Sequence, residues 1–181
     1  MSNIRLFYPE NIIDNSTSLL SKEHTQYVVN VMRLKRGSNL NFFNKKGEWN
    51  SEIVFLDIYS VVVKFLSKVK EHGVSLNIEL AICKEKKNPM ETILQKATEL
   101  GVSKITPIIS ERTEVKELNY ERAKKIVVEA TEQSNQLSPP EISEVVKLKD
   151  FLNNLDGSTK LLFADVNSKD NLKKETSSEV K

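Results

Sequence analysis

Residues 88–112 have the sequence Asn88-Pro-Met-Glu-Thr-Ile-Leu-Gln-Lys-Ala-Thr-Glu-Leu-Gly-Val-Ser-Lys-Ile-Thr-Pro-Ile-Ile-Ser-Glu-Arg112 and predict a helix followed by a buried strand. Gly101 is expected to end the helix, because a residue without Cβ takes a positive φ at little steric cost. The apolar run 105–109 then predicts a strand that ends on Glu111 and Arg112. The apolar residues of the helix recur at the spacing of one helix face: Met90, Ile93, Leu94, Ala97 and Leu100.

The residues on either side continue this alternation of strands and helices. Apolar runs predict further strands at 78–83, 142–146 and 160–166. Helical spacing predicts helices at 120–133 and 148–155, the first with Ala123, Ile126, Val127 and Ala130 on its inner face. Strands that alternate with helices favour a parallel sheet, so residues 73–181 are expected to form an α/β domain.

Residues 1–72 have a different pattern, with short strand-like runs and one helix. Strands are expected at 4–8, 40–44, 49–57 and 60–69, with a hairpin loop at 45–48. Ser21 is a good N-cap for a helix that runs to Met32. Several short strands with one helix favour a small closed barrel, because closure removes free strand edges. We place the domain boundary near Gly73.

Composition excludes several classes of protein. The 181 residues are 39% hydrophobic and 29% charged, which is typical of a globular protein. No apolar run approaches the roughly 20 residues of a membrane span, and the first residues lack a signal-peptide core. The single Cys83 excludes an intramolecular disulfide and a multi-cysteine metal site. We therefore expect a cytoplasmic protein without a membrane partner.

Charge gives only a weak indication of a nucleic-acid partner. The net charge is +2, but residues 1–72 carry 10 Lys or Arg against 7 Asp or Glu, whereas residues 73–181 carry 17 against 18. An imbalance of this size is also common on surfaces with no role in RNA binding.

Two groups of basic residues are candidates for contacts with phosphate. Lys84 and Arg112 follow the first two strands of the α/β domain, whose carboxyl ends meet at one edge of a parallel sheet. Arg5, Arg33, Lys35 and Arg36 could share one face of the first domain, with Tyr8 and Phe43 available for base stacking. For both groups the alternative is a solvated surface without a ligand.

The sequence favours structural roles for the histidines, the cysteine and Glu99. His24 and His72 stand in polar surroundings that favour surface positions, and Cys83 ends an apolar strand that favours a buried thiol. Glu99 lies in the last turn of its helix, where the helix dipole disfavours an anion, so a pair with Lys96 is expected.

Four passages resemble the RsmE-type family of 16S ribosomal RNA (uracil-N3)-methyltransferases, which belong to the knotted SPOUT group. They are Arg5-Leu-Phe7; Val31-Met-Arg33 followed by Gly37; Gln95 to Gly101 with Ser110-Glu-Arg112; and Ala130-Thr-Glu-Gln-Ser134 followed by Pro140-Glu-Ile142. The passages occur in the family's order across nearly the whole chain. Two departures are that Tyr27 replaces a common histidine and Asn135-Gln136 replaces a Gly-Arg pair, which removes a cation.

The resemblance implies a two-domain α+β protein. Residues 1–72 would form a PUA-like RNA-binding β-barrel, and residues 73–181 an incomplete SPOUT methyltransferase domain of the trefoil-knot type. The implied reaction is methylation of N3 of a uridine in 16S ribosomal RNA by S-adenosylmethionine, with the small ribosomal subunit as partner and a homodimer as the family's assembly. Arg5, Arg33, Lys35, Arg36, Lys84 and Arg112 would contact RNA.

The family's cofactor loops do not occur in the sequence. They contain Gly-Pro-Glu-Gly-Gly and a later Leu-Gly…Leu-Arg segment, and neither is present in the 181 residues. We therefore assign no cofactor ligand, expect a C-terminally truncated domain, and do not expect the family's homodimer, which forms through the knotted region. The alternative to an enzyme is a non-catalytic RNA-binding protein that retains the barrel and half of the α/β layer.

Overall fold

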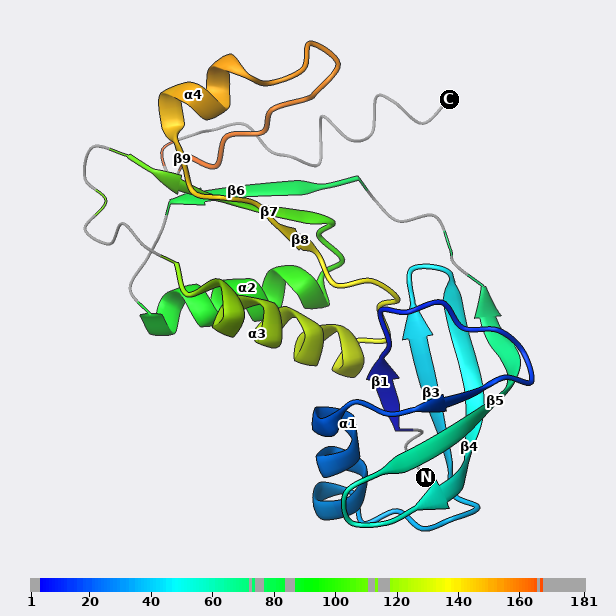
Figure 1. The fold of residues 1–181 in the computed structure, drawn as a ribbon. Coiled ribbons are helices and arrows are strands. Elements are labelled where there is room, and N and C mark those ends of the chain that lie inside the picture. Colours follow the sequence, from blue (N-terminus) through cyan, green and yellow to red (C-terminus); the bar gives the residue numbers. More distant parts are fainter. Residues whose placement is uncertain are drawn as a thin grey trace. The chain divides into compact units, whose positions relative to one another are not determined.

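The structure is a computed structural model that describes residues 4–71, 73, 77–83, 87–110, 113, 118–165 and 167. By its internal contacts the chain divides into one unit of residues 1–148 and a second of residues 149–181. The first unit holds two sheets, each with its own hydrophobic core (Figure 1). None of the helices in the described part of the chain is long and apolar enough to cross a membrane.

The N-terminal sheet has five strands in the order β1-β3-β4-β5-β2. The β1–β3 pair is parallel and the other three pairs are antiparallel. In the described residues no ladder joins the outer strands β1 and β2, so the closed barrel predicted from the sequence is not found. The strands are β1 (Arg5–Phe7), β2 (Thr17–Leu19), β3 (Asn39–Asn44), β4 (Gly47–Leu56) and β5 (Val61–Glu71).

One helical segment covers this sheet and confirms the predicted cap. The Ser21 side chain accepts a hydrogen bond from the His24 N–H and begins α1 (Lys22–Gln26), which continues as the π-helix η1 (Tyr27–Val31). Val28 of η1 is fully buried against strand residues. Every strand except β2 contributes large apolar side chains to the core. The largest fully buried side chains in this sheet are Phe42, Phe43, Phe65, Leu40 and Ile53.

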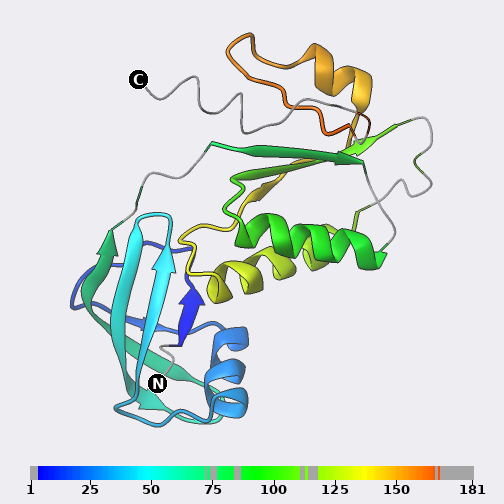
Figure 2. The ribbon, with the colours of Figure 1, turned by 180° about the vertical axis from the view of Figure 1, so that it is seen from behind.

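The second sheet is parallel, as the sequence predicts. Its strands are β6 (Glu79–Cys83), β7 (Lys104–Ile109), β8 (Glu141–Ile142) and β9 (Val146–Lys147). β6, β8 and β9 all pair with β7. The two helices α2 (Lys87–Glu99) and α3 (Tyr120–Gln133) cover the same face of the sheet (Figures 1 and 2). The four residues predicted for the inner face of α3 are all buried.

The end of α2 confirms the role of Gly101. Its φ is +83°, and the N–H groups of Gly101 and Val102 donate to the carbonyls of Thr98 and Ala97. This pair of bonds satisfies carbonyls that the helix end leaves without partners. The prediction for Leu100 is wrong, because its side chain is 79% exposed and does not join the apolar face.

Two strand predictions near the C-terminal end are also wrong. The run 142–146 is divided into the two short strands β8 and β9. Residues 160–165 form no strand in the described chain, because an apolar run becomes a strand only where a partner strand supplies hydrogen bonds. Helix α4 (Leu148–Asn153) begins as predicted but ends two residues earlier.

Candidate functional site

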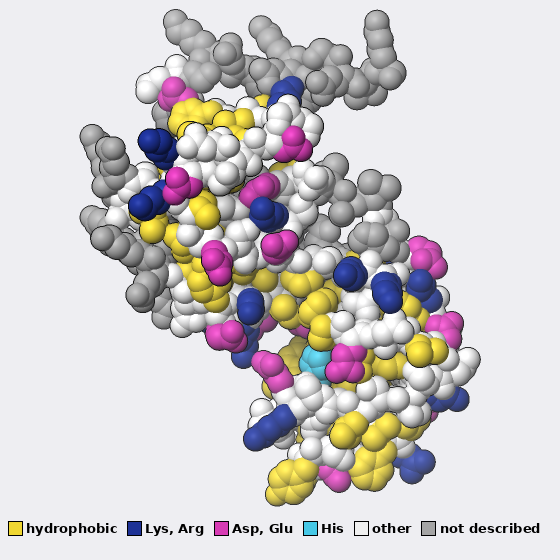
Figure 3. All heavy atoms as spheres, turned by 45° about the horizontal axis from the view of Figure 1, so that its top comes forward, with side chains coloured by type: hydrophobic (Ala, Val, Ile, Leu, Met, Phe, Trp, Pro, Cys, Tyr) yellow, Lys and Arg dark blue, Asp and Glu magenta, His cyan; other side chains and the backbone are white. Residues whose placement is uncertain are grey.

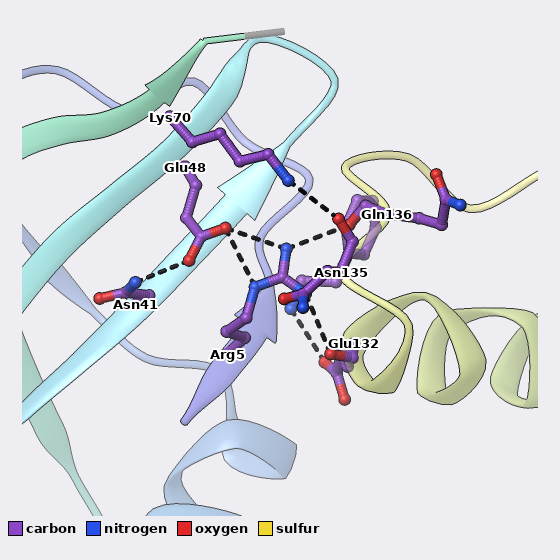
Figure 4. A network of polar contacts seen from close by, with 8 residues as sticks. Arg5, Asn41, Glu48, Lys70, Glu132, Asn135 and Gln136 are labelled. Carbon is purple, nitrogen blue, oxygen red and sulfur yellow. Dashed lines mark hydrogen bonds and ion pairs between the residues drawn. The ribbon is translucent and has the colours of Figure 1, made fainter. Parts of the chain in front are cut away.

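Arg5 is a buried connector between β1 and the C-terminal end of α3 (Figure 4). Its guanidinium donates to the main-chain carbonyls of Glu132 and Gln136 at 3.0 and 3.1 Å. It also forms an ion pair with Glu48 at 3.0 Å, and the two side chains are only 8% and 7% exposed. The guanidinium carbon lies 4.3 Å from the ring centroid of Phe43. Protein groups therefore surround the Arg5 guanidinium on several sides.

Further contacts extend this network across the same junction. The second carboxylate oxygen of Glu48 accepts a hydrogen bond from the side-chain amide of Asn41 at 2.6 Å. The Lys70 ammonium donates to the main-chain carbonyl of Asn135, whose φ is +60°. Asparagine tolerates this left-handed conformation better than most residues do, which suits Asn135 to this position.

Glu132 joins the network from α3. Its carboxylate accepts a hydrogen bond from the Phe7 N–H at 2.9 Å. Burial raises the pKa of Glu132 above its ordinary value of 4.5, the nearby Glu129 and Glu23 raise this pKa further, and the Phe7 N–H and Arg5 lower it. The strongest of these influences is the loss of hydration, so the folded protein favours the protonated acid more than the unfolded chain does.

These contacts correct three of the residues selected from the sequence. Arg5 has protein partners and little exposed surface, so it is unsuited to contact phosphate. Tyr8 and Phe43, chosen for base stacking, are both buried in the N-terminal sheet. The Tyr8 hydroxyl is instead within 2.7 Å of the Ser18 hydroxyl, and burial raises the pKa of Tyr8.

The other three cations selected from residues 1–72 lie in one exposed segment. Arg33, Lys35 and Arg36 follow η1 and precede β3, and all three are exposed. Arg33 has a φ of +51°, and the adjoining Leu34 N–H donates to the Val28 carbonyl, so the chain turns sharply away from the helix. We call residues 33–38 the basic loop. It contains no acidic residue, and its cations are free to meet an anionic ligand.

The basic loop is held against β4 at its far end. The Gly37 N–H donates to the Ile53 carbonyl, and the Ile53 N–H donates to the Ser38 carbonyl. The Lys35 N–H also donates to the Ser38 hydroxyl at 3.1 Å. These bonds fix the backbone of the loop while its long cationic side chains extend into solvent.

The predicted cations of the second domain, Lys84 and Arg112, lie outside the described residues. On either side of Arg112 in the sequence, the Ser110 N–H donates to the Thr113 hydroxyl at 2.8 Å. Cys83, at the end of β6, is exposed, so the prediction of a buried thiol is wrong.

The remaining polar candidates have structural partners or lie at the surface. Lys96 forms the predicted pair with Glu99 at 2.7 Å and lowers the pKa of that carboxyl, an effect that Gln95 reinforces through a hydrogen bond. His24 is not a surface residue as predicted: its ring packs edge-on to Phe42, its Nδ1 is buried without a partner, and burial lowers its pKa. His72 lies outside the described residues.

Two grooves lie away from the carboxyl edge of the parallel sheet. One, of about 390 Å³, lies at the amino end of β7 and is lined by Lys45, Lys70 and Gln136 among others. The second, of about 450 Å³, lies along α2 and α3 and includes Gln95 and Gln133. Neither groove lies at the strand ends where an α/β sheet binds its ligand. The described residues contain no cluster of metal-binding side chains.

Comparison with known proteins identifies the family. A model of the RNA methyltransferase domain matches residues 72–181. The chain belongs to the RNA methyltransferase family. Among its relatives is the ribosomal RNA small subunit methyltransferase E of Rickettsia conorii, which is 32% identical over 150 residues. That alignment covers 82% of this chain and 62% of the relative. A protein of the same name from Aquifex aeolicus is 46% identical over 67 residues, or 35% of this chain and 29% of the relative.

Solved structures agree with this family. A Legionella pneumophila protein in complex with S-adenosylmethionine has a TM-score of 0.82 at 32% identity, over 93% of this chain and 73% of that protein. The ribosomal RNA small subunit methyltransferase E of Neisseria gonorrhoeae, also bound to S-adenosylmethionine, has a TM-score of 0.77 at 28% identity, over 86% and 66% of the two chains. The chain spans about three-fifths of the length of its Rickettsia relative.

Sequence reasoning missed the structural role of Arg5 and the exposed aromatic residues near the basic loop. The first depends on Glu132 and Gln136, which lie more than 120 positions away in the chain. The exposure of Tyr59 had a usable signal, because this residue lies between two strand-like runs, where side chains of a tight turn are normally exposed.

Proposed function

We propose that this protein is an S-adenosylmethionine-dependent methyltransferase that modifies N3 of a uridine in 16S ribosomal RNA of the small ribosomal subunit. The observation that carries the proposal is the family match over residues 72–181, together with the fold similarity to two proteins that bind S-adenosylmethionine. The names of the relatives support ribosomal RNA as the substrate.

The proposed division of labour follows the two cores of the molecule. Residues 1–72 form an RNA-binding domain of PUA-like type, and residues 73–181 form the methyltransferase domain. In support, the family model begins at residue 72, and each sheet has a separate hydrophobic core.

The proposed RNA contacts come from the basic loop and from the strand ends of the second domain. Arg33, Lys35 and Arg36 bind phosphates and set the position of the RNA strand. Lys84 and Arg112 remain proposed contacts beyond the described residues. Arg5 is removed from the set, because its guanidinium already binds Glu48, Glu132 and Gln136.

The substrate imposes a condition on how RNA is bound. N3 of uracil is protonated near neutral pH and takes part in base pairing, so the target uridine must be unpaired and must lose its proton. Phosphate contacts on each side of the target hold the strand while this base is free. No described residue is assigned to the methyl donor, and the proposal derives no step through it.

Transfer of a labelled methyl group tests the function. Purified protein is incubated with methyl-labelled S-adenosylmethionine and small ribosomal subunits that lack the modification, and the RNA is digested to nucleosides. We expect label in N3-methyluridine and heat of binding when the protein is titrated with S-adenosylmethionine. RNA binding without label and without heat would contradict methyl transfer and leave the alternative of a non-catalytic RNA-binding protein.

A further inference from the structure

The turn between β4 and β5 presents an unusually exposed aromatic ring. Tyr59 is 83% exposed, although it lies in a hydrogen-bonded turn. The Asp57 carboxylate accepts hydrogen bonds from the N–H groups of Tyr59 and Ser60 at 2.7 and 2.6 Å, and the Asp57 N–H donates to the Ser60 carbonyl. The turn is therefore fixed by its own hydrogen bonds, and the ring is not needed to hold it.

A row of apolar side chains runs across the sheet next to this turn. Phe55 of β4 pairs with Val62 of β5, and Val62 pairs with Leu19 of β2. The pairing of β4 with β5 shifts between Ile53 and Phe55, so that Ile53 is fully buried whereas Phe55 is 49% exposed. Leu19 is exposed as well. In a regular strand, Phe55 would lie on the same face as Ile53. The shift in pairing turns the Phe55 side chain outward instead.

The basic loop flanks the other side of β4. Gly37 and Ser38 are hydrogen-bonded to Ile53, two residues before Phe55 in the sequence. A strand rises about 3.3 Å per residue and neighbouring strands lie about 4.8 Å apart, so the loop and the turn lie within roughly 20 Å of each other. Both lie at the same end of the N-terminal sheet (Figures 1 and 2), where apolar and basic side chains stand side by side at the lower end of Figure 3.

We propose that Tyr59 and Phe55 form a stacking surface for unpaired bases of RNA, with the phosphates of the same strand bound by Arg33, Lys35 and Arg36. The inference rests on the proposed function. It supplies the base stacking that Tyr8 and Phe43 cannot provide, because both are buried. An apolar patch alone fits many partners, but exposed rings beside three cations fit a polyanion whose bases have free π-faces. The Asp57 carboxylate accepts two hydrogen bonds within its own turn, and the three cations of the basic loop outweigh its single negative charge.

Base stacking and phosphate contacts respond differently to salt, so variants that remove one or the other can be told apart. Each base stacked on an aromatic side chain contributes an affinity that is independent of sequence and of salt, whereas each phosphate contact adds to the salt dependence. A single-stranded oligouridylate offers both contacts. A duplex of the same length offers phosphates but no free base faces.

The experiment measures the affinity of the full chain for fluorescein-labelled oligouridylate over a series of salt concentrations. Tyr59→Ala is expected to weaken binding about five-fold or more at every salt concentration, with the slope unchanged, and Tyr59→Phe to bind as the original protein does. Phe55→Leu, which keeps an apolar side chain but removes the ring, is expected to weaken binding in the same way. Binding to the duplex should not change in any of these variants.

A matched control is Phe163→Ala, which removes an aromatic ring of nearly equal exposure (84%) from the other unit. It should leave oligouridylate binding unchanged. Equal affinities of Tyr59→Ala and the original protein for oligouridylate would overturn the stacking surface. That outcome would not affect the proposed function, which is tested separately by the labelled methyl group and by the basic loop variants.

Discussion

The guanidinium of Arg5 lies 3.0 Å from the main-chain carbonyl of Glu132, a residue 127 positions later in the chain. Carbonyls in the last turn of a helix have no partner within that helix, and the helix dipole favours a cation there. Arg5 thus satisfies the end of α3 from β1, and Glu48 balances its charge in a site that is almost closed to solvent. Arg5, selected from the sequence as an RNA contact, is therefore a structural residue.

Removal of Arg5 should destabilise the protein strongly. Arg5→Ala leaves the Glu48 carboxylate buried without its cation, a change that typically costs about 3–5 kcal/mol. The free energy of unfolding, measured in urea, is expected to fall by that amount. Arg122→Ala is the control, because Arg122 pairs with Glu91 at the surface, where solvent screens an ion pair and its contribution to stability is small. Equal effects of the two substitutions would show that Arg5 is not the structural residue described here.

Glu132 should make the stability depend on pH. Burial raises its pKa in the folded protein above 4.5, so the folded state binds the proton more tightly than the unfolded chain. This contribution to stability is fully present below pH 4.5 and is lost as pH rises through the raised pKa. Glu132→Gln keeps an acceptor for the Phe7 N–H and cannot titrate. Relative to this variant, the original protein should lose stability as pH rises over that interval; a constant difference between the two would refute the assignment.

Gly101 should not tolerate a side chain. Its φ of +83° costs an L-residue about 1–2 kcal/mol, and a Cβ there would lie 3.2 Å from the side-chain nitrogen of Gln136. Gly101→Ala should therefore lower the midpoint of thermal unfolding. Gly73→Ala is the control, since no atom lies within 4 Å of a Cβ at that position. A lower midpoint in the control alone, or in neither variant, would contradict the conformation assigned to Gly101.

The thiol of Cys83 should react in the folded protein. Cys83 is exposed at the end of β6 and is the only cysteine in the chain. Ellman's reagent is expected to modify the Cys83 thiol to the same extent with and without denaturant. Reaction only after unfolding would contradict the exposure of Cys83 and favour the buried thiol predicted from the sequence.

Much of the fold follows from local sequence patterns. The helix predicted at 120–133 matches α3, because four apolar residues recur at the helical period and are buried in the structure. The end of α2 followed from one glycine whose conformation few other residues adopt. These features depend on neighbours within a few positions, which sequence reasoning can use directly.

The features that were missed depend on partners far away in the chain. Thr17–Leu19 is too short and polar to indicate a strand, and it forms β2 only because β5 offers an edge. The run 160–165 has the right composition but no described partner strand. The burial of Phe43 and the exposure of Phe55 depend on which face each strand turns inward, and a register shift in β4 reverses that choice for Phe55.

The salt dependence of RNA binding tests most directly the claim that the basic loop, and not Arg5, binds RNA. The double variant Arg33→Ala/Arg36→Ala is compared with Arg122→Ala/Lys124→Ala, which removes the same charge from exposed positions on α3. For single-stranded RNA, the slope of the logarithm of affinity against the logarithm of salt should become shallower by about 1.4 in the first variant, or about 0.7 for each lost phosphate contact. It should stay constant in the second. An unchanged slope in Arg33→Ala/Arg36→Ala would contradict the account.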